Sequence, residues 1–465
     1  MVQLINQIDY LGGNMKFLIA LWVGKFINVL INIIDKTRGS NFSGEKALKI
    51  DPQMIKHFKG IDYEKVVFIT GSNGKSTTTS LINHALKTNG KTITTNSEGA
   101  NLIGGVATAL IKNSTLTGRI KSEYCVFETD ERFLPIIHEQ LPAKNIVITN
   151  VQRDQSHRNG DPDFIYRTLL PVMKKDVKLF LNNDEPRVKS FGMHNPNYVT
   201  YGVSRHEESF DVNKDFATMA CPYCFHDIDF KYYNNPSVGP FTCTNCGNGS
   251  EEHADYEVTD VDFENRKFKI EGIEYYMPYT IPYMLYNYSA TAAVAKEMAG
   301  INSKEVAEAF KTYSIIGGRA EVLKYKDKTI KYMKFKQESP ETLQTCINIM
   351  AADKTKKAVC IGLGVVTDII PNYINTVYAC ECDFTQLEES GVESYYCFTE
   401  NACYDAANIL IYQGIDPDKI TIEETEDPKT IFEQIDKIDC DNIYLITLMG
   451  NFEIIQSVLH LEREA

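Results

Sequence analysis

Short β-branched and aromatic runs alternate with longer helical patterns between about Tyr63 and Gly202. The clearest apolar runs are Val66–Ile69, Cys125–Phe127 and Ile146–Ile148. Strands that alternate with helices in this way are typical of a parallel sheet covered by helices. We therefore predict an α/β fold for this part of the chain.

The pattern changes after this region. From about 205 to 279 the segments are short, aromatic and charged, which predicts an inserted β-rich module. Helical periodicity returns from Tyr283 to about Met298, and a second α/β pattern follows, with strands expected at Ala358–Ile361 and Ile443–Ile446. We predict a central domain over 61–316 and a smaller C-terminal α/β domain over 317–465.

The first 60 residues form a lead-in to the central domain. Within them, Met15–Ile34 approaches the roughly 20 apolar residues that a transmembrane helix requires. Lys16 and Lys25 interrupt this stretch, and no small-residue cleavage site of a signal peptide follows it. We predict an amphipathic helix packed on the central domain, and contact of this helix with a membrane surface remains an alternative.

Composition narrows the class of protein. The chain has 465 residues, of which 43% are hydrophobic and 24% charged, so a mainly disordered protein is excluded. Its 62 acidic and 48 basic residues give a net charge of -14, which disfavours long-range attraction to nucleic acid or to an anionic bilayer. Twelve cysteines without a signal peptide indicate the cytoplasm, where thiols stay reduced.

A phosphate-binding loop follows the first predicted strand. The segment Thr70–Thr77 reads TGSNGKST and precedes a helical pattern, which is the context that a P-loop requires. It departs from the general pattern because Ile69 stands where the first glycine belongs. Backbone N–H groups of such a loop surround phosphate, and the lysine meets the terminal phosphates. The predicted ATP-binding residues of the loop are Gly71, Ser72, Asn73, Gly74, Lys75, Ser76 and Thr77.

Polar residues end the neighbouring strands. Glu128 closes the run Cys125–Phe127, and a carboxylate at that edge can ligate magnesium between the β- and γ-phosphates. We predict Glu128 and the Ser76 hydroxyl as magnesium ligands. Thr149–Asn150 and the segment from Arg153 to His157 add polar groups to the same rim.

Four cysteines form two CxxC pairs, Cys221 with Cys224 and Cys243 with Cys246. Two such knuckles supply the tetrahedral four-sulfur site that zinc favours, and four protein ligands leave no open position for catalysis. We predict a structural zinc ribbon, with a redox dithiol or chance spacing as alternatives. The module has few Lys or Arg residues, which argues against nucleic-acid binding.

These motifs resemble the Mur ligase superfamily, whose nucleotide loop has the pattern TG[ST]NGK[ST]. Within it, the chain looks like a MurT-type ligase subunit of lipid II isoglutaminyl synthase. The further matching segments are Thr94–Asn101, Thr149–Gln155, Leu181–Pro186 and the predicted zinc ribbon. The resemblance covers about residues 15 to 325 well and the remainder weakly, with departures at Lys334–Pro340 and Pro371–Glu381.

The resemblance implies roles that the residues alone do not. Asn287 would lie against the nucleotide, and Arg319 would reach the phosphates from a hinge at Gly317–Arg319. Thr95, Asn96 and Asn101 would line the entry of a lipid-linked sugar peptide. An acid of the C-terminal domain, Glu381 or Asp383, would complete the Cys–His pair of a GatD-type glutaminase bound as a heterodimer.

The function expected from this resemblance is ATP-dependent amidation of a stem-peptide carboxylate of lipid II, with Mg²⁺ and Zn²⁺ as metals. No cysteine in the sequence stands in a Gly-x-Cys-x-Gly nucleophile elbow, so a separate subunit would supply ammonia. A Mur or folylpolyglutamate-type ligase that adds an amino acid is one alternative. A nucleotide- and zinc-binding scaffold without turnover is another.

Overall fold

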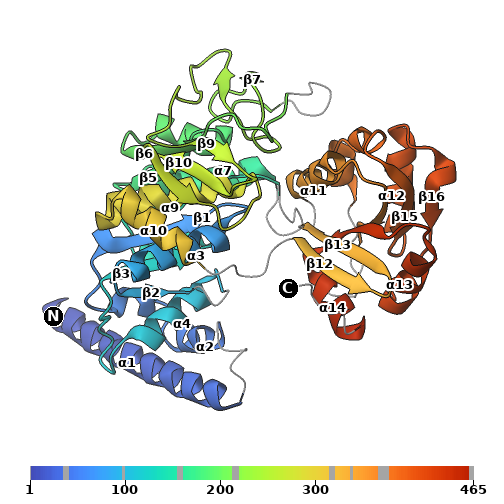
Figure 1. Cartoon of the computed structure of the whole chain (residues 1–465). Helices are drawn as coiled ribbons and strands as arrows, with labels where there is room; N and C mark the ends of the chain where they lie inside the picture. Colours follow the sequence, from blue (N-terminus) through green and yellow to red (C-terminus); the bar gives the residue numbers. More distant parts are fainter. Residues whose placement is uncertain are drawn as a thin grey trace.

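The computed structural model describes residues 2–34, 41–96, 100–153, 161–211, 219–313, 320–335, 339–364 and 376–459. In these residues the strands form a large sheet, a second sheet nearer the C terminus and a small two-stranded sheet (Figure 1). The two larger sheets lie side by side with their helices around them, and residues 314–319 between them lie outside the description. The predicted hinge at Gly317–Arg319 falls there.

The large sheet has the strand order β11-β10-β9-β6-β5-β4-β1-β3-β2. Neighbouring strands from β9 to β2 run parallel, and β10 and β11 continue the sheet as antiparallel strands. The bounds are β1 Val66–Thr70, β2 Ile93–Thr95, β3 Tyr124–Glu128, β4 Asn145–Ile148, β5 Lys178–Asn182, β6 Tyr198–Val203, β9 Tyr256–Asp262, β10 Lys267–Ile270 and β11 Ile273–Tyr276.

Helices cover both faces of this sheet, which explains why its central strands are apolar throughout. Along β1, Val66 and Phe68 belong to one buried cluster, while Val67 and Ile69 belong to the cluster on the opposite face. The helices of this part are α1 Val2–Ile34, α2 Phe42–Ile50, α3 Lys75–Thr88, α4 Ile103–Asn113, α5 Leu134–Gln140, α7 Pro162–Met173, α8 Pro186–Ser190, α9 Met284–Ala299 and α10 Ser303–Lys311.

The second sheet has the order β12-β13-β17-β14-β15-β16, with β12 as its antiparallel edge strand. The strands expected at Ala358–Ile361 and Ile443–Ile446 are β14 and β17 at its centre. The strands are β12 Ala320–Tyr325, β13 Lys328–Phe335, β14 Lys357–Gly362, β15 Val392–Phe398, β16 Ile420–Ile422 and β17 Asn442–Leu448. The helices are α11 Pro340–Ala352, α12 Ala402–Tyr412, α13 Pro428–Lys437 and α14 Met449–Leu459.

Short 3-10 helices link several of these elements. They are η1 Met54–His57, η2 Tyr63–Lys65, η3 Phe191–Met193, η4 Val377–Glu381, η5 Thr385–Leu387 and η6 Pro417–Lys419.

The segment expected as one inserted module over about 205–279 divides into two parts. The cysteine knuckles flank the two-stranded sheet of β7 Ile228–Phe230 and β8 Phe241–Cys243. Strands β9 to β11 instead extend the large sheet, because β9 pairs with the edge strand β6. The ribbon itself is therefore smaller than the sequence pattern suggests.

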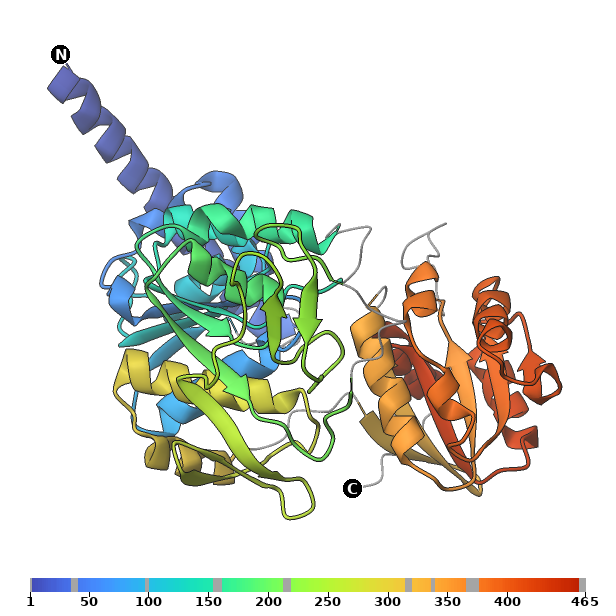
Figure 2. The ribbon, with the colours of Figure 1, turned by 90° about the horizontal axis from the view of Figure 1, so that it is seen from above.

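Helix α1 is longer than the predicted stretch and packs on α2 and α4 (Figure 1). Figure 2 shows its N-terminal part extending away from the rest of the protein. Phe17, Ala20 and Leu21 are buried against the domain, as expected for an amphipathic helix. The stretch Asn14–Ile31 also has the length and composition of a membrane span, and 28% of it is buried.

Candidate functional site

The phosphate loop lies between β1 and the N terminus of α3, as the sequence predicts. Gly74 has a φ of 86°, and a Cβ atom there would lie 2.7 Å from Asn287 Oδ1. Glycine is therefore required both by the backbone conformation and by the close approach of Asn287. Asn287 comes from α9 and also accepts a hydrogen bond of 3.2 Å from Thr78 Oγ1. Its predicted place beside the nucleotide loop agrees with this geometry.

The loop lysine is held by an acidic residue. Lys75 Nζ lies 2.8 Å from Glu131 Oε1, and the same oxygen accepts the Gly71 N–H at 3.0 Å. Both side chains are buried. The Glu131 carboxylate therefore lies between a loop N–H and the lysine, where a phosphate oxygen of a bound nucleotide would lie. Sequence analysis missed this role of Glu131, although the acidic run from Glu128 to Glu131 was the available signal.

Glu128 ends β3 directly beside Ile69 of β1, at the carboxyl edge of the sheet. Its backbone is fixed by Asn96, which accepts the Glu128 N–H at 2.9 Å and donates to the Glu128 carbonyl at 2.8 Å. Ser76 is exposed at the start of α3 on the same edge. The positions of Glu128 and Ser76 therefore suit magnesium, which prefers carboxylate and hydroxyl oxygens.

The residues expected at the substrate entry have internal partners as well. Thr95 Oγ1 accepts a hydrogen bond of 2.9 Å from Asn83, and the Asn101 carbonyl accepts the Asp130 N–H at 2.9 Å. Asn96 is buried and holds the end of β3. These contacts position the acidic run, and substrate contact by Thr95, Asn96 and Asn101 stays a prediction.

The loop after β4 ties the phosphate loop in place. Asn150 Oδ1 accepts the Asn73 N–H at 2.8 Å, Thr149 Oγ1 donates to the Asn73 carbonyl at 2.6 Å, and Ser72 Oγ donates to the Gln152 carbonyl at 2.8 Å. A cavity beside the loop is lined by Asn73, Gly74, Asn150, Gln152, Tyr286 and Asn287, and by Glu341, Thr342 and Thr345 of α11. The C-terminal domain therefore contributes directly to the surroundings of the phosphate loop. Arg319 lies outside the described residues.

Tyr286, which lines this cavity, is hydrogen-bonded to a buried carboxylate. Asp184 follows β5 and accepts hydrogen bonds from Tyr286 Oη at 2.8 Å and from the Val203 N–H at 3.1 Å. Complete burial raises the pKa of Asp184 to about 7, because desolvation penalises the charged form. The resemblance included Asp184 only as part of the segment Leu181–Pro186.

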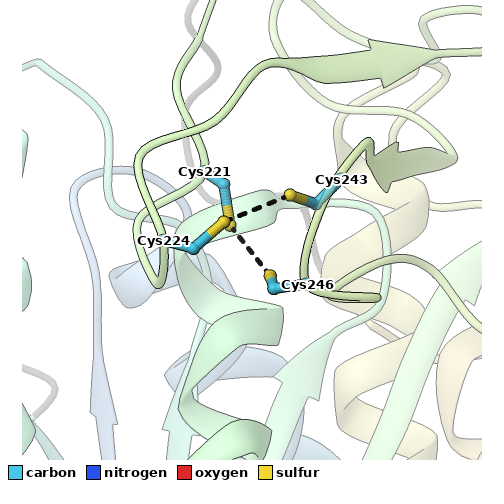
Figure 3. A group of neighbouring side chains, drawn as sticks. All are labelled: Cys221, Cys224, Cys243 and Cys246. Atoms are coloured by element: carbon cyan, nitrogen blue, oxygen red, sulfur yellow. Dashed lines mark hydrogen bonds between the residues drawn. The ribbon is translucent and has the colours of Figure 1, made fainter.

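The four cysteines converge on one point (Figure 3). All four Sγ atoms lie within 4.8 Å of one another, and the Cys221–Cys246 and Cys224–Cys243 pairs are 3.7 and 3.5 Å apart. A zinc ion with bonds of about 2.3 Å to tetrahedral sulfurs requires about 3.8 Å between them. The backbone N–H of His226 lowers the pKa of Cys224, which favours its thiolate, while burial raises the pKa of Cys246. This donor set fits zinc.

The two candidate acids of the C-terminal domain have different surroundings. Glu381 forms an ion pair with Arg153 of the loop after β4, and the Glu381 side chain is 44% exposed. Asp383 is buried and accepts hydrogen bonds from the Thr385 N–H at 3.1 Å and from Gln386 at 3.3 Å, so its carboxylate is engaged in the turn that precedes η5. Both acids line a cavity of about 300 Å³ together with Phe210, Tyr233 and Gln344. Glu381 is therefore the acid with the more accessible carboxylate.

Comparison with known proteins agrees with the loop and with the two-sheet architecture. Residues 69–246 match the Mur ligase middle domain, and residues 337–449 match the MurT ligase C-terminal domain. The chain therefore combines a Mur ligase middle domain with a MurT ligase C-terminal domain. Mur ligases are ATP-dependent enzymes that also use Mg²⁺, and the phosphate loop with Glu128 and Ser76 fits both.

Two relatives of this MurT-type chain extend over most of its length. The lipid II isoglutaminyl synthase (glutamine-hydrolyzing) subunit MurT of Streptococcus pneumoniae R6 is 27% identical over 93% of this chain and 94% of its own length. The subunit of the same name from Staphylococcus aureus COL is 28% identical, covering 77% and 79% of the two chains.

Solved structures share the fold. A pseudomurein peptide ligase type C from Methanothermus fervidus aligns with a TM-score of 0.64 at 20% identity, over 91% of this chain and 86% of that one. MurF from Acinetobacter baumannii aligns with a TM-score of 0.57 at 12% identity, over 90% and 80%. At these identities the likeness concerns the Mur ligase fold.

The C-terminal part agrees with the resemblance stated from the sequence. Residues 337–449 match the MurT ligase C-terminal domain. The departures at Lys334–Pro340 and Pro371–Glu381 are therefore local changes within a domain of the family. Residues 336–338 and 365–375 of these segments lie outside the described residues.

Proposed function

We propose that this chain is the ligase subunit of a lipid II isoglutaminyl synthase, and that it amidates the D-glutamate carboxylate of the stem peptide to D-isoglutamine. The observation that carries this proposal is the combination of one phosphate loop, Thr70–Thr77, with a domain that matches the MurT ligase C-terminal domain. The general Mur ligase fold alone would support many acceptors, whereas this C-terminal match favours a MurT-type reaction.

Amidation requires an activated carboxylate, because a carboxylate anion is a poor electrophile. Transfer of the γ-phosphoryl group from ATP to the carboxylate gives an acyl phosphate and ADP. Ammonia attacks the acyl carbon, phosphate leaves, and the nitrogen loses a proton to give the amide. Lys75 and the N–H groups at the start of α3 bind the phosphates and offset their charge. Magnesium, held by Ser76 and Glu128, would neutralise charge on the β- and γ-phosphates.

Ammonia would come from a GatD-type glutaminase bound as a heterodimer. In this arrangement Glu381 orients the histidine of the partner's Cys–His pair. The exposed carboxylate of Glu381 supports this assignment, since the buried carboxylate of Asp383 already accepts the Thr385 N–H. The zinc ribbon would stabilise the wall of the cavity beside the phosphate loop. Gly239 lies between β7 and β8 of the ribbon, and its N–H donates a hydrogen bond of 2.9 Å to the Asp184 carbonyl. The enzyme would act in the cytoplasm on the lipid-linked substrate.

A ligase that adds an amino acid is the second candidate. It is favoured by similarity to the UDP-N-acetylmuramoylalanine--D-glutamate ligase of Prochlorococcus marinus, which is 27% identical over 31% of this chain. A scaffold without turnover is the third candidate, motivated by the local departures at Lys334–Pro340 and Pro371–Glu381. Lys75 and Glu128 on one sheet edge argue against loss of turnover.

Phosphate release with different nucleophiles distinguishes the three candidates. The purified chain is mixed with ATP, magnesium and lipid II, and then with ammonium, with single amino acids or with neither. Ammonium-dependent release supports the amide ligase, and amino-acid-dependent release supports the second candidate. Zinc and ATP binding without any lipid-II-dependent release would support the scaffold and contradict the proposal.

A further inference from the structure

Helix α1 has two apolar faces, and the domain covers one of them. Phe17, Ala20 and Leu21 are buried, while a second row of large apolar side chains is exposed at alternating intervals of four and three residues. This row consists of Met15, Ile19, Trp22, Phe26 and Val29, which are 50% to 66% exposed. Residues at these intervals lie on one side of a helix and form a continuous stripe.

The stripe is more apolar than the sequence suggests, because Lys25 points away from it. Lys25 Nζ donates hydrogen bonds of 2.7 and 2.6 Å to the carbonyls of Ile111 and Ser114 at the end of α4. Trp22 Nε1 donates to the Leu116 carbonyl at 2.9 Å, so the indole is anchored at its edge while its ring remains half exposed. These contacts fix the rotation of α1 and hold the stripe outward.

Neighbouring elements add exposed apolar and basic side chains. Leu116 and Phe42 are 68% and 47% exposed. The segments 14–31, 42–50 and 111–121 are fully described, and within them Glu45 is the one acidic residue. The exposed or half-buried basic side chains of these segments other than Lys25 are Lys16, Lys46, Lys49, Lys112, Arg119 and Lys121. This local positive charge contrasts with the net charge of -14 for the chain.

We propose that the exposed face of α1, together with Leu116 beside Trp22, binds the surface of an anionic lipid bilayer. The helix would lie in the plane of the interface rather than cross it, because its other face packs on α2 and α4. Gly24 illustrates this packing, since a Cβ there would lie 2.7 Å from Ile111 Cδ1. A helix with large apolar side chains on one side and lysines at its border is typical of interfacial membrane binding.

A second copy of the chain fits this face less well. Two copies related by a twofold axis would place the same surfaces together, so the basic border would face itself. An anionic bilayer instead offers complementary charge to the border and a hydrocarbon boundary to the stripe. The proposal does not rest on the ligase activity, and its test uses binding rather than turnover.

Trp22 is the single tryptophan of the chain, so its fluorescence reports on this face alone. The purified full chain is mixed with vesicles of phosphatidylglycerol and phosphatidylcholine, and with vesicles of phosphatidylcholine only. We expect a blue shift of the Trp22 emission and co-sedimentation with the anionic vesicles, both weakened by added salt. Emission and sedimentation that do not change with anionic vesicles would overturn the proposal.

Charge-introducing variants on the stripe sharpen the test. Ile19→Glu and Phe26→Glu retain Trp22 and change exposed side chains, so the fold should persist, as an unchanged melting temperature would verify. Together they should weaken vesicle binding at least about tenfold. Tyr412→Glu is the matched control, because Tyr412 is 92% exposed on the C-terminal domain. Equal loss in the control, or a blue shift that depends on protein concentration without vesicles, would contradict a bilayer-specific face.

Discussion

Lys75 of the phosphate loop is paired with Glu131 at 2.8 Å, and Glu131 also accepts the Gly71 N–H. An acidic side chain therefore holds two of the groups that a nucleotide phosphate needs. Binding of ATP must displace this carboxylate or move it toward the metal. The Lys75–Glu131 pair is therefore expected to break when a nucleotide binds, and substitution of Glu131 tests this.

Glu131→Gln should tighten ADP binding in the absence of magnesium by about tenfold, because a neutral amide competes less with phosphate for Lys75. Glu128→Gln is the matched comparison, since it alters the predicted magnesium ligand and leaves the Lys75–Glu131 pair in place. That variant should weaken the magnesium-dependent part of binding. Calorimetric titration of ADP with and without magnesium measures both effects. Weaker magnesium-free binding in Glu131→Gln would show that Glu131 supports the loop instead of competing with phosphate.

Substitutions of the two candidate acids of the C-terminal domain should affect glutamine-dependent amidation differently. Glu381→Gln should abolish glutamine-dependent amidation with the glutaminase partner, because it removes the carboxylate that orients the partner's histidine. It should retain ammonium-dependent amidation, because its other effect is the loss of a partly exposed ion pair with Arg153. Asp383→Asn should retain both activities and change stability little, because the amide oxygen can still accept the Thr385 N–H. Paired assays with glutamine and with ammonium give the comparison. A selective loss of the glutamine reaction in Asp383→Asn would reverse the assignment.

The cysteine cluster predicts one tightly bound zinc per chain. Cys243→Ser removes one of the four converging sulfurs and should lose the metal and lower the melting temperature. Cys380→Ser is the control, because Cys380 is exposed and lies outside the cluster. Elemental analysis of the purified proteins checks the metal content. Absence of zinc from the unmodified chain, or its retention in Cys243→Ser, would refute a four-sulfur site.

Asp184 should make stability depend on pH. Its pKa is raised to about 7 in the folded chain, whereas an exposed aspartate titrates near the usual value of about 4. Between these values the folded state retains a proton that the unfolded state has released, so this group's contribution to the free energy of unfolding falls as pH rises. Above about pH 7 the dependence should level off.

Asp184→Asn removes this contribution while its amide oxygen can still accept from Tyr286. The unfolding free energy of the unmodified chain minus that of Asp184→Asn should therefore fall from about pH 4 to 7. Glu185, whose pKa burial also raises to about 7, is present in both and cancels. Urea denaturation at several pH values measures the difference. A difference that stays constant with pH would contradict burial of an ionisable Asp184.

The sequence predicted the parts of the fold that depend on local pattern. The strands at Val66–Ile69 and Ile146–Ile148 are apolar on both faces, and such runs indicate a covered parallel sheet whatever surrounds them. The spacing of the cysteine pairs likewise suggested their convergence, because each knuckle bends two thiols toward one point. The loop at Gly71–Thr77 was found from its glycine spacing.

Contacts between distant segments could not be predicted in this way. Lys25 reads as a charge that interrupts an apolar stretch, but its ammonium group bonds carbonyls of α4 that lie more than 80 residues away. Glu131 reads as a loop acid until its distance to Lys75 is known. Asp383 was an equal candidate with Glu381 because the sequence does not reveal its hydrogen bonds to Thr385 and Gln386.

The most direct test of the account is the mass of lipid II after incubation with the purified chain, ATP, magnesium and ammonium. The account predicts a product in which one stem-peptide carboxylic acid is replaced by a primary amide, formed with equimolar phosphate release. This product should be absent with Lys75→Ala, which removes the loop's phosphate-binding ammonium group. Unchanged lipid II with the unmodified chain, or equal amidation by Lys75→Ala, would contradict an amide ligase that acts through this loop.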